Sequence, residues 1–211
     1  MITTLLRPSA FLAMAVAALV LASCAGSPPA RFYTLTALQA PQAPAKEPQV
    51  KPSTVVAVDP VRIPDYLDRP QITTRTGANE LTFTEFDQWA GPLAEEIHRT
   101  MIENLSALLR PKGIHVISWK TAIPGRMMLG ISVTKFEATS GGTVSFRVLW
   151  GLTGDVEKTA RLIRESVITK PLAQGGYGTI AATMSTVLED FSREVAAAIE
   201  ETLKAGQTPT R

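Results

Sequence analysis

The 211-residue sequence has little from which a metal site or a disulfide framework could be built. It contains one Cys and two His. A single Cys cannot form an internal disulfide, and a transition-metal site would need carboxylates for most of its ligands. Charges nearly cancel, with 21 Lys and Arg against 19 Asp and Glu, so the basic excess typical of nucleic-acid binding is missing. We therefore expect no metal, no cofactor and no nucleic-acid partner.

Groups that could carry catalysis are also scarce. Glu95 and His98 form one Glu-x-x-His pair, whereas di-iron bundles need two such pairs and further Glu, and the other histidine is His115. The glycine-rich stretch 175–178 lacks the Lys of a phosphate-binding loop, and no Gly-x-Ser-x-Gly motif is present. We expect that the protein is not an enzyme, that His98 is a surface or boundary residue, and that 175–178 leads into a helix.

The first 23 residues have the pattern of a lipoprotein signal peptide. A basic start that includes Arg7 is followed by an apolar run over residues 10–22, and residues 21–24 (Leu-Ala-Ser-Cys) closely resemble a bacterial lipobox. As a helix the run spans about 20 Å, short of the ~30 Å hydrocarbon core, which disfavours an uncleaved transmembrane anchor. We predict a signal peptide at 1–23 and lipidation of Cys24 by a diacylglycerol and an N-acyl chain. Ordinary signal cleavage beside an unmodified Cys24 is the alternative.

The residues around Cys24 also predict a location. Two or three acyl chains hold a protein stably on a membrane. In enterobacterial lipoproteins an Asp after the acylated Cys commonly retains the protein in the inner membrane, and here Ala25 follows. We therefore expect a lipid-anchored protein on the periplasmic face of the outer membrane. Residues 24–30 form a short tether, and the chain from Cys24 to Phe32 reaches about 26 Å at full extension.

Hydrophobic periodicity predicts a single α+β domain. Helical spacing of apolar residues marks helices at 89–109 and 178–204, and alternation or β-branched runs mark the strands. Strands are expected at 31–35, 54–58, 114–119, 127–134, 143–150 and 160–169, and 71–75 and 80–84 are short strand candidates. We expect one mostly antiparallel sheet of about six or seven strands with both amphipathic helices on one face. This periplasmic domain would occupy 31–204, with a Pro-rich loop at 37–53 and a flexible tail at 205–211.

One segment carries a recognisable signature. It contains Pro64–Ile72, Arg75–Gly77, Asn79 and Phe86–Leu93. These residues resemble the signature of the ABC-type transport auxiliary lipoproteins, the PqiC-like family, and with Phe32–Leu35 and Met184–Glu194 the resemblance covers essentially the whole mature chain. Gly91 and Gln88 depart from the pattern, since an acidic and a basic residue, respectively, are frequent there.

The resemblance implies a non-enzymatic component of an MCE/ABC-type intermembrane lipid transport system that supports envelope integrity. Such a protein docks or anchors a periplasmic MCE tunnel, formed by a PqiB-like MCE-domain protein, at the outer membrane. By analogy it forms a homo-oligomer. Two alternatives remain open: a periplasmic lipid-binding shuttle with an apolar cavity, and a structural or assembly lipoprotein that binds cell wall or an outer-membrane barrel.

Within the signature, four side chains are candidates for partner or subunit contact. Asp65, Tyr66, Asp68 and Arg69 are expected on an exposed, proline-bounded loop. In the other interpretation Asp68 and Arg69 form a local ion pair, while Tyr66, together with Leu67 and Trp89, fills the core.

Overall fold

The computed structural model describes residues 28–39, 54–121, 123, 126–154 and 160–206. Two units are distinguished, Met1–Ala30 and Arg31–Arg211. In the first, residues 28–30 are described, and they are exposed. The expected signal peptide at 1–23, Cys24, most of the Pro-rich loop and residues 207–211 lie outside the described residues. The fold reported below is that of the second unit.

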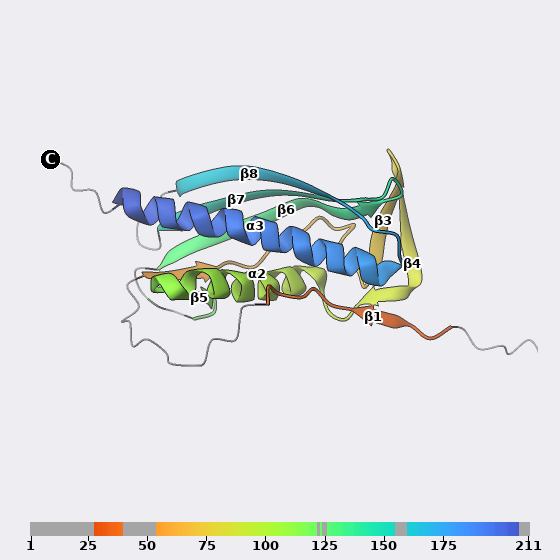
Figure 1. Ribbon diagram of the computed structural model, residues 1–211, viewed down its shortest axis with the longest axis horizontal. Helices are drawn as coiled ribbons and strands as arrows, with labels where there is room; N and C mark the ends of the chain where they lie inside the picture. The colour runs from red at the N-terminus through yellow and green to blue at the C-terminus, as the bar shows by residue number, and fades with distance from the viewer. Residues whose placement is uncertain (1–27, 40–53, 122, 124–125, 155–159, 207–211) are drawn as a thin grey trace, which may run out of the picture. The chain divides into compact units, whose positions relative to one another are not determined.

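Eight strands and two long helices make up the described part of this unit (Figure 1). In chain order the elements are β1 (Arg31–Tyr33), β2 (Thr54–Val58), β3 (Gln71–Gly77), β4 (Glu80–Trp89), α2 (Leu93–Leu109), the 3₁₀ turn η1 (Arg110–Lys112), β5 (Ile114–Ser118), β6 (Met127–Thr139), β7 (Thr143–Gly154), β8 (Ala160–Pro171) and α3 (Tyr177–Gly206).

Apolar spacing explains where α2 lies. Its residues at every fourth position from Leu93 to Leu109 are buried, which gives one continuous apolar stripe facing the sheet. Glu95 and Glu96 in the first turn are favourable near the positive end of the helix dipole. The helix ends through η1 at Gly113, whose φ of 75° is the left-handed conformation that glycine tolerates best.

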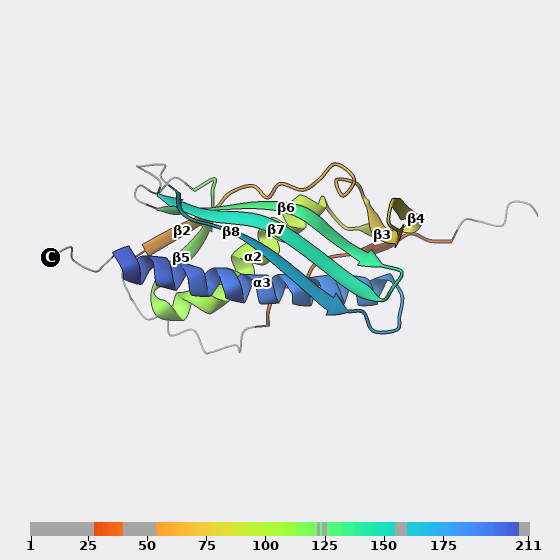
Figure 2. The ribbon, with the colours of Figure 1, turned by 90° about the horizontal axis from the view of Figure 1, so that it is seen from above.

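The sheet is built around β6. On one side β6 pairs antiparallel with β7, which pairs antiparallel with β8. On its other side β6 pairs parallel with β2 near its start and with β3 near its end. Strand β5 pairs with the free side of β2. Strand β4 pairs with the free side of β3, and β1 pairs with β4. Figure 2 shows the long ribbon of β6, β7 and β8 crossing over the two helices.

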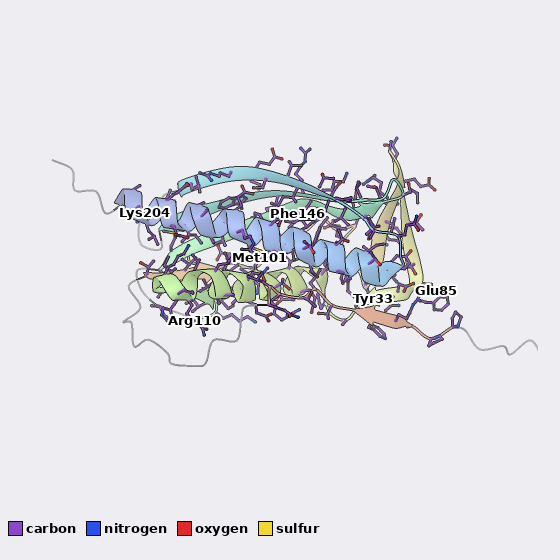
Figure 3. The ribbon with its side chains drawn as sticks, viewed as in Figure 1. Tyr33, Glu85, Met101, Arg110, Phe146 and Lys204 are labelled. Atoms are coloured by element: carbon purple, nitrogen blue, oxygen red, sulfur yellow. The ribbon has the colours of Figure 1, made fainter. Side chains whose placement is uncertain are left out.

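The core lies between this ribbon and the helices. Four aromatic side chains from β6, β7 and α3 pack edge to face there: Phe136 on Phe146 at 4.9 Å between ring centroids, Phe146 on Phe191 at 5.3 Å, and Trp150 on Phe191 at 5.9 Å. Figure 3 places Phe146 between the sheet and α3. Such contacts add to the stability gained by burying the rings.

The predicted fold class is confirmed, with two corrections. The sheet has eight strands and is mixed, because β1, β2 and β3 all make parallel pairs. The first helix begins at Leu93, four residues later than expected. Trp89 instead ends β4 and donates its N–H to the carbonyl of Pro70, and Pro92 precedes the first helical residue. Neither α2 nor α3 combines the length and apolar character needed to span a membrane, and this holds for the described residues as a whole.

Candidate functional site

The predicted contact loop, residues 64–70, is a turn on the outer side of the sheet. The N–H of Leu67 donates to the carbonyl of Pro64 at 2.9 Å, and the N–H of Asp68 donates to that of Asp65 at 3.1 Å. Leu67 is buried, whereas Asp65 and Asp68 are exposed. The turn therefore presents two carboxylates to solvent while its centre is fixed in the core. We call residues 64–70 the signature loop.

Tyr66 of the signature loop packs over a buried carboxylate. Glu137 on β6 is fully buried, and the Arg75 guanidinium on β3 binds both of its carboxylate oxygens, one through Nε and the other through Nη2 at 3.2 Å. The Lys135 ammonium lies 3.3 Å from the same carboxylate. Burial by itself would raise the pKa of Glu137, but the hydrogen bonds from Arg75 and Lys135 bring it below its usual value. Burial, together with the negative charge of Glu137, raises the pKa of Tyr66 to about 12.

Arg69 does not contact Asp68 in an ion pair. Its guanidinium stacks over the ring of Phe83 on β4, 3.9 Å from the ring centroid. A cation on an aromatic face is stabilised by about 0.5–1 kcal/mol at such a partly exposed position. Tyr66 and Arg69 thus hold the signature loop onto the sheet, and Asp65 and Asp68 are the two predicted contact residues that remain free to face a partner.

A second carboxylate joins β4 to the start of the domain. Asp87 is buried on β4 and lies beside Arg31 in the parallel pairing of β1 with β4. It accepts hydrogen bonds from Arg31 at 3.0 Å, Tyr33 at 2.8 Å and Thr84 at 3.1 Å. Burial would raise the pKa of Asp87, and these donors lower it below its ordinary value. Figure 3 shows Tyr33 and Glu85, from β1 and β4, at the end of the helices opposite Lys204.

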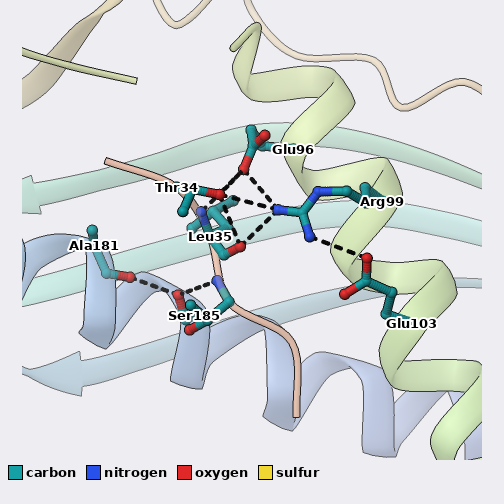
Figure 4. A network of polar contacts seen from close by, with 8 residues as sticks. Thr34, Leu35, Glu96, Arg99, Glu103, Ala181 and Ser185 are labelled. Atoms are coloured by element: carbon teal, nitrogen blue, oxygen red, sulfur yellow. Dashed lines mark hydrogen bonds and ion pairs between the residues drawn. The ribbon is translucent and has the colours of Figure 1, made fainter. Parts of the chain in front are cut away.

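After β1 the chain runs as an extended segment between the two helices. We call residues 34–38 the strap (Figure 4). On the α2 side, Glu96 accepts from the Thr34 hydroxyl at 2.5 Å and the Leu35 N–H at 3.1 Å, while Arg99 donates to the Leu35 carbonyl at 2.7 Å. The Leu35 side chain is 1% exposed, so it is an apolar anchor within this polar frame.

The strap is tied to α3 as well. The N–H of Thr36 donates to the Ser185 hydroxyl at 3.1 Å. The N–H of Leu38 donates to the Asn104 side chain at 2.6 Å, and Asn104 in turn donates to Ser192 at 3.0 Å. Side chains of both helices therefore satisfy backbone groups of the strap, which would otherwise be unpaired.

Sequence reasoning assigned no role to the residues that hold these two regions, although Arg75 and Asp87 lie within the signature segment. The residues that hold the two regions are Arg75, Asp87, Glu96, Arg99, Asn104, Glu137 and Ser185. The helical pattern places Glu96 and Arg99 on the polar side of α2, which is a partial signal. Nothing in the local sequence distinguishes Asp87 or Glu137 from exposed strand residues.

The other motifs have structural roles. His98, expected at the surface or boundary, is instead buried, where it contacts the Val58 carbonyl through Nε2 at 3.1 Å. At the start of α3 a side chain on Gly175 would place its Cβ 2.1 Å from the Thr179 hydroxyl oxygen, so the glycine-rich stretch is packed as a helix lead-in. The described residues contain no group of three metal-binding side chains.

Comparison with known proteins extends over nearly the whole domain. The family model for the ABC-type transport auxiliary lipoprotein component matches residues 33–196. The chain is 26% identical over 189 residues to the Intermembrane transport lipoprotein PqiC of Escherichia coli (strain K12), covering 88% of this chain and 94% of that protein, and it matches the Shigella flexneri protein of the same name equally.

Solved structures show the same fold. A crystal structure of an uncharacterized protein superposes with a TM-score of 0.70 and 20% identity, covering 82% of this chain and 99% of that one. A Xanthomonas campestris protein superposes with a TM-score of 0.66 and 20% identity, covering 84% and 100%. The family match over residues 33–196 includes the strap, the signature loop and both helices. The chain belongs to the ABC-type transport auxiliary lipoprotein component family and is a PqiC-like auxiliary lipoprotein of a transport system.

Proposed function

We propose that this protein is the non-enzymatic outer-membrane component of an MCE/ABC-type intermembrane lipid transport system. Anchored through acyl chains on Cys24 at the periplasmic face, it docks the end of a periplasmic MCE tunnel as a homo-oligomer and so supports envelope integrity. The observation that carries this proposal is spatial: the signature loop lies on β3, β4 and β6, and β4 pairs directly with β1, the first strand after the tether.

This arrangement suits a docking role for two reasons. First, the exposed carboxylates of Asp65 and Asp68 sit on a turn held by Tyr66 and Arg69, so little conformational entropy is lost when a partner binds. Second, charged groups on a rigid surface loop speed association with a surface of opposite charge. A basic surface on the MCE-domain partner is the complement that this loop requires.

The shuttle alternative receives less support. It needs a sizeable apolar cavity between the helices and the sheet. In the described residues that interface is filled by the edge-to-face aromatic side chains of β6, β7 and α3. Mass spectrometry of lipid extracted from the purified protein tests this point, because a shuttle would copurify with lipid at close to one molecule per chain.

A binding measurement tests the docking role. We would titrate the purified protein with the periplasmic part of the MCE-domain protein from the same cell. The double variant Asp65→Asn/Asp68→Asn should bind at least about tenfold more weakly. A double variant with the same change in charge, Glu95→Gln/Glu201→Gln, alters exposed residues of α2 and α3 and should bind as the wild type does.

Two other outcomes of this binding measurement would refute parts of the proposal. Absence of binding by the wild-type protein would refute docking, and cosedimentation with cell wall or with a barrel protein would then favour the structural alternative. Binding that is unaffected by the Asp65→Asn/Asp68→Asn change would refute the assignment of the signature loop to the interface.

A further inference from the structure

Strand β8 forms a long free border of the sheet. It pairs with β7 along one side from Ala160 to Pro171, and within the described part of the chain no strand pairs with its other side. Most of its side chains are exposed. Figures 1 and 2 show β8 as the outermost strand of the ribbon. Unpaired N–H and C=O groups along such a border can pair with another extended strand.

Aliphatic side chains are exposed along this border, on the face away from the helices. Ile163 is 67% exposed, Val167 59% and Leu149 of β7 49%. Gly151 lies directly beside Ile163 in the β7–β8 register, and a Cβ on Gly151 would be 2.7 Å from the Leu162 carbonyl oxygen. Only glycine fits there, so β7 presents no side chain directly opposite Ile163.

The charges on the inner face of β8 are already neutralised within the chain. Lys170 pairs with Asp190 of α3 at 2.8 Å, and Arg164 lies 3.6 Å from Glu201. On the outer face Glu165 lies 3.5 Å from Arg147, with both side chains more than half exposed. A strand that pairs with this border therefore has to complement chiefly the charges and apolar side chains of the outer face.

The outer face has a charge order that fits a second copy of itself. Arg161, Ile163 and Glu165 alternate along β8, so a cation, an aliphatic group and an anion follow one another at equal spacing. If two β8 strands run antiparallel with Ile163 opposite its own copy, each Arg161 faces a Glu165. Centring the pair on Arg164 or Glu165 instead would place that charge opposite its own copy, which is unfavourable.

We propose that β8 pairs antiparallel with β8 of a second copy of this chain, with Ile163 on the two-fold axis. The contact joins residues 160–166 of both copies and buries Ile163 against its own copy. It is isologous, unlike the head-to-tail contacts that close a ring. A seven-residue strand pair is smaller than a standard stable interface, so the dimer is weak in dilute solution.

The contact does not depend on docking to an MCE-domain protein. Its strength on the membrane does rest on the proposed lipid anchor, because two chains held on one bilayer meet at a higher effective concentration.

Disulfide crosslinking of the full chain in isolated membranes tests the register. In the proposed pair the two Ile163 Cβ atoms are about 5 Å apart, so Ile163→Cys should crosslink rapidly on mild oxidation. Val167→Cys is the matched control: it lies on the same face with similar exposure, but its two copies are about 27 Å apart. The wild type, whose single cysteine is Cys24, reports any crosslink formed through chains in which Cys24 is not acylated.

Two outcomes would overturn the proposal. One is absence of a crosslink in the Ile163→Cys chain beyond the wild-type level. The other is equally fast crosslinking of Ile163→Cys and Val167→Cys, which would indicate random collision.

Charge exchange tests the same contact independently. In the Ile163→Cys background, Arg161→Glu or Glu165→Arg alone places like charges opposite each other and should slow crosslinking about tenfold. The double exchange should restore most of the rate. Failure of the double exchange to recover the rate would refute the pairing of Arg161 with Glu165. Binding of the MCE-domain partner, measured on the same variants, separates the two proposals, since the β8 variants should retain it.

Discussion

The Glu137 site gives the most stringent test of how the signature loop is held. Glu137→Gln keeps the shape of the side chain and removes its charge, which leaves Arg75 and Lys135 without their shared anion. Removing one partner of a buried ion pair lowers the free energy of unfolding by about 3–5 kcal/mol. The Arg75 and Lys135 side chains are 25% and 35% exposed, so water can solvate them in part. We therefore expect a loss near the lower limit, about 3 kcal/mol in the free energy of unfolding.

Urea unfolding at pH 7 measures this loss. With a slope of about 2 kcal/mol per molar urea, the midpoint should fall by about 1.5 M. Glu189→Gln is the control, because Glu189 pairs with Arg193 on the surface of α3 at 2.7 Å, with the Arg193 side chain 53% exposed and that of Glu189 32% exposed. Removing such a pair should cost about 0.3–0.5 kcal/mol.

A double-mutant cycle isolates the coupling. Glu137→Leu and Arg75→Met together should cost clearly less than the sum of the two single changes, because the double variant leaves neither Arg75 without its anion nor Glu137 without its main partner. A loss below about 1 kcal/mol for Glu137→Gln, or strict additivity in the cycle, would refute the reasoning that this carboxylate holds the site through charge.

Three further predictions concern acid, the strap and the lipid anchor. The pKa values of Asp87, Glu96 and Glu137 are lowered in the folded state. The stability that these carboxylates confer is therefore complete above their unfolded-state pKa of about 4.5 and declines as the pH falls toward their folded-state pKa values. A urea midpoint that stays constant between pH 5 and pH 3 would contradict this. Leu35→Ala should lower the free energy of unfolding by about 3 kcal/mol because it opens a cavity between the helices, whereas Leu149→Ala, at an exposed position, should cost less than about 1 kcal/mol; equal losses would show that Leu35 does not anchor the strap. Cys24→Ala should move the protein from the membrane fraction to the soluble fraction with an unchanged circular dichroism spectrum, and its persistence in membranes would exclude a lipid-only anchor.

Periodicity was sufficient to predict most of the elements. The stripe of α2 and the alternation from Met127 to Val133 follow directly from repeats of 3.6 and 2 residues. The parallel pairs were not predictable in this way. Strand β2 joins β5 and β6 across long stretches of chain, and these pairings depend on tertiary packing rather than on any local turn.

The buried carboxylates escaped prediction for a related reason. The β6–β7 register shifts between Val133 and Lys135, so the simple alternation does not continue to Glu137. That side chain faces away from the helices and is buried because the Arg75 and Tyr66 side chains cover it. The backbone bonds of the strap likewise join residues more than 60 positions apart, so no local pattern encodes them.

The strap also determines how mechanical tension would pass through the domain. A force applied at Arg31 first meets the Asp87 ion pair and then the bonds from the strap to Glu96 and Ser185. Because β1 and β4 run parallel, a pull along β1 loads their bonds together in shear, and the strap divides the remaining load between α2 and α3. The rate of forced unfolding then depends on rupture of several bonds at once. If the proposed lipid anchor on Cys24 holds the protein by its N-terminus, a pull on that anchor would thus leave the signature loop in position.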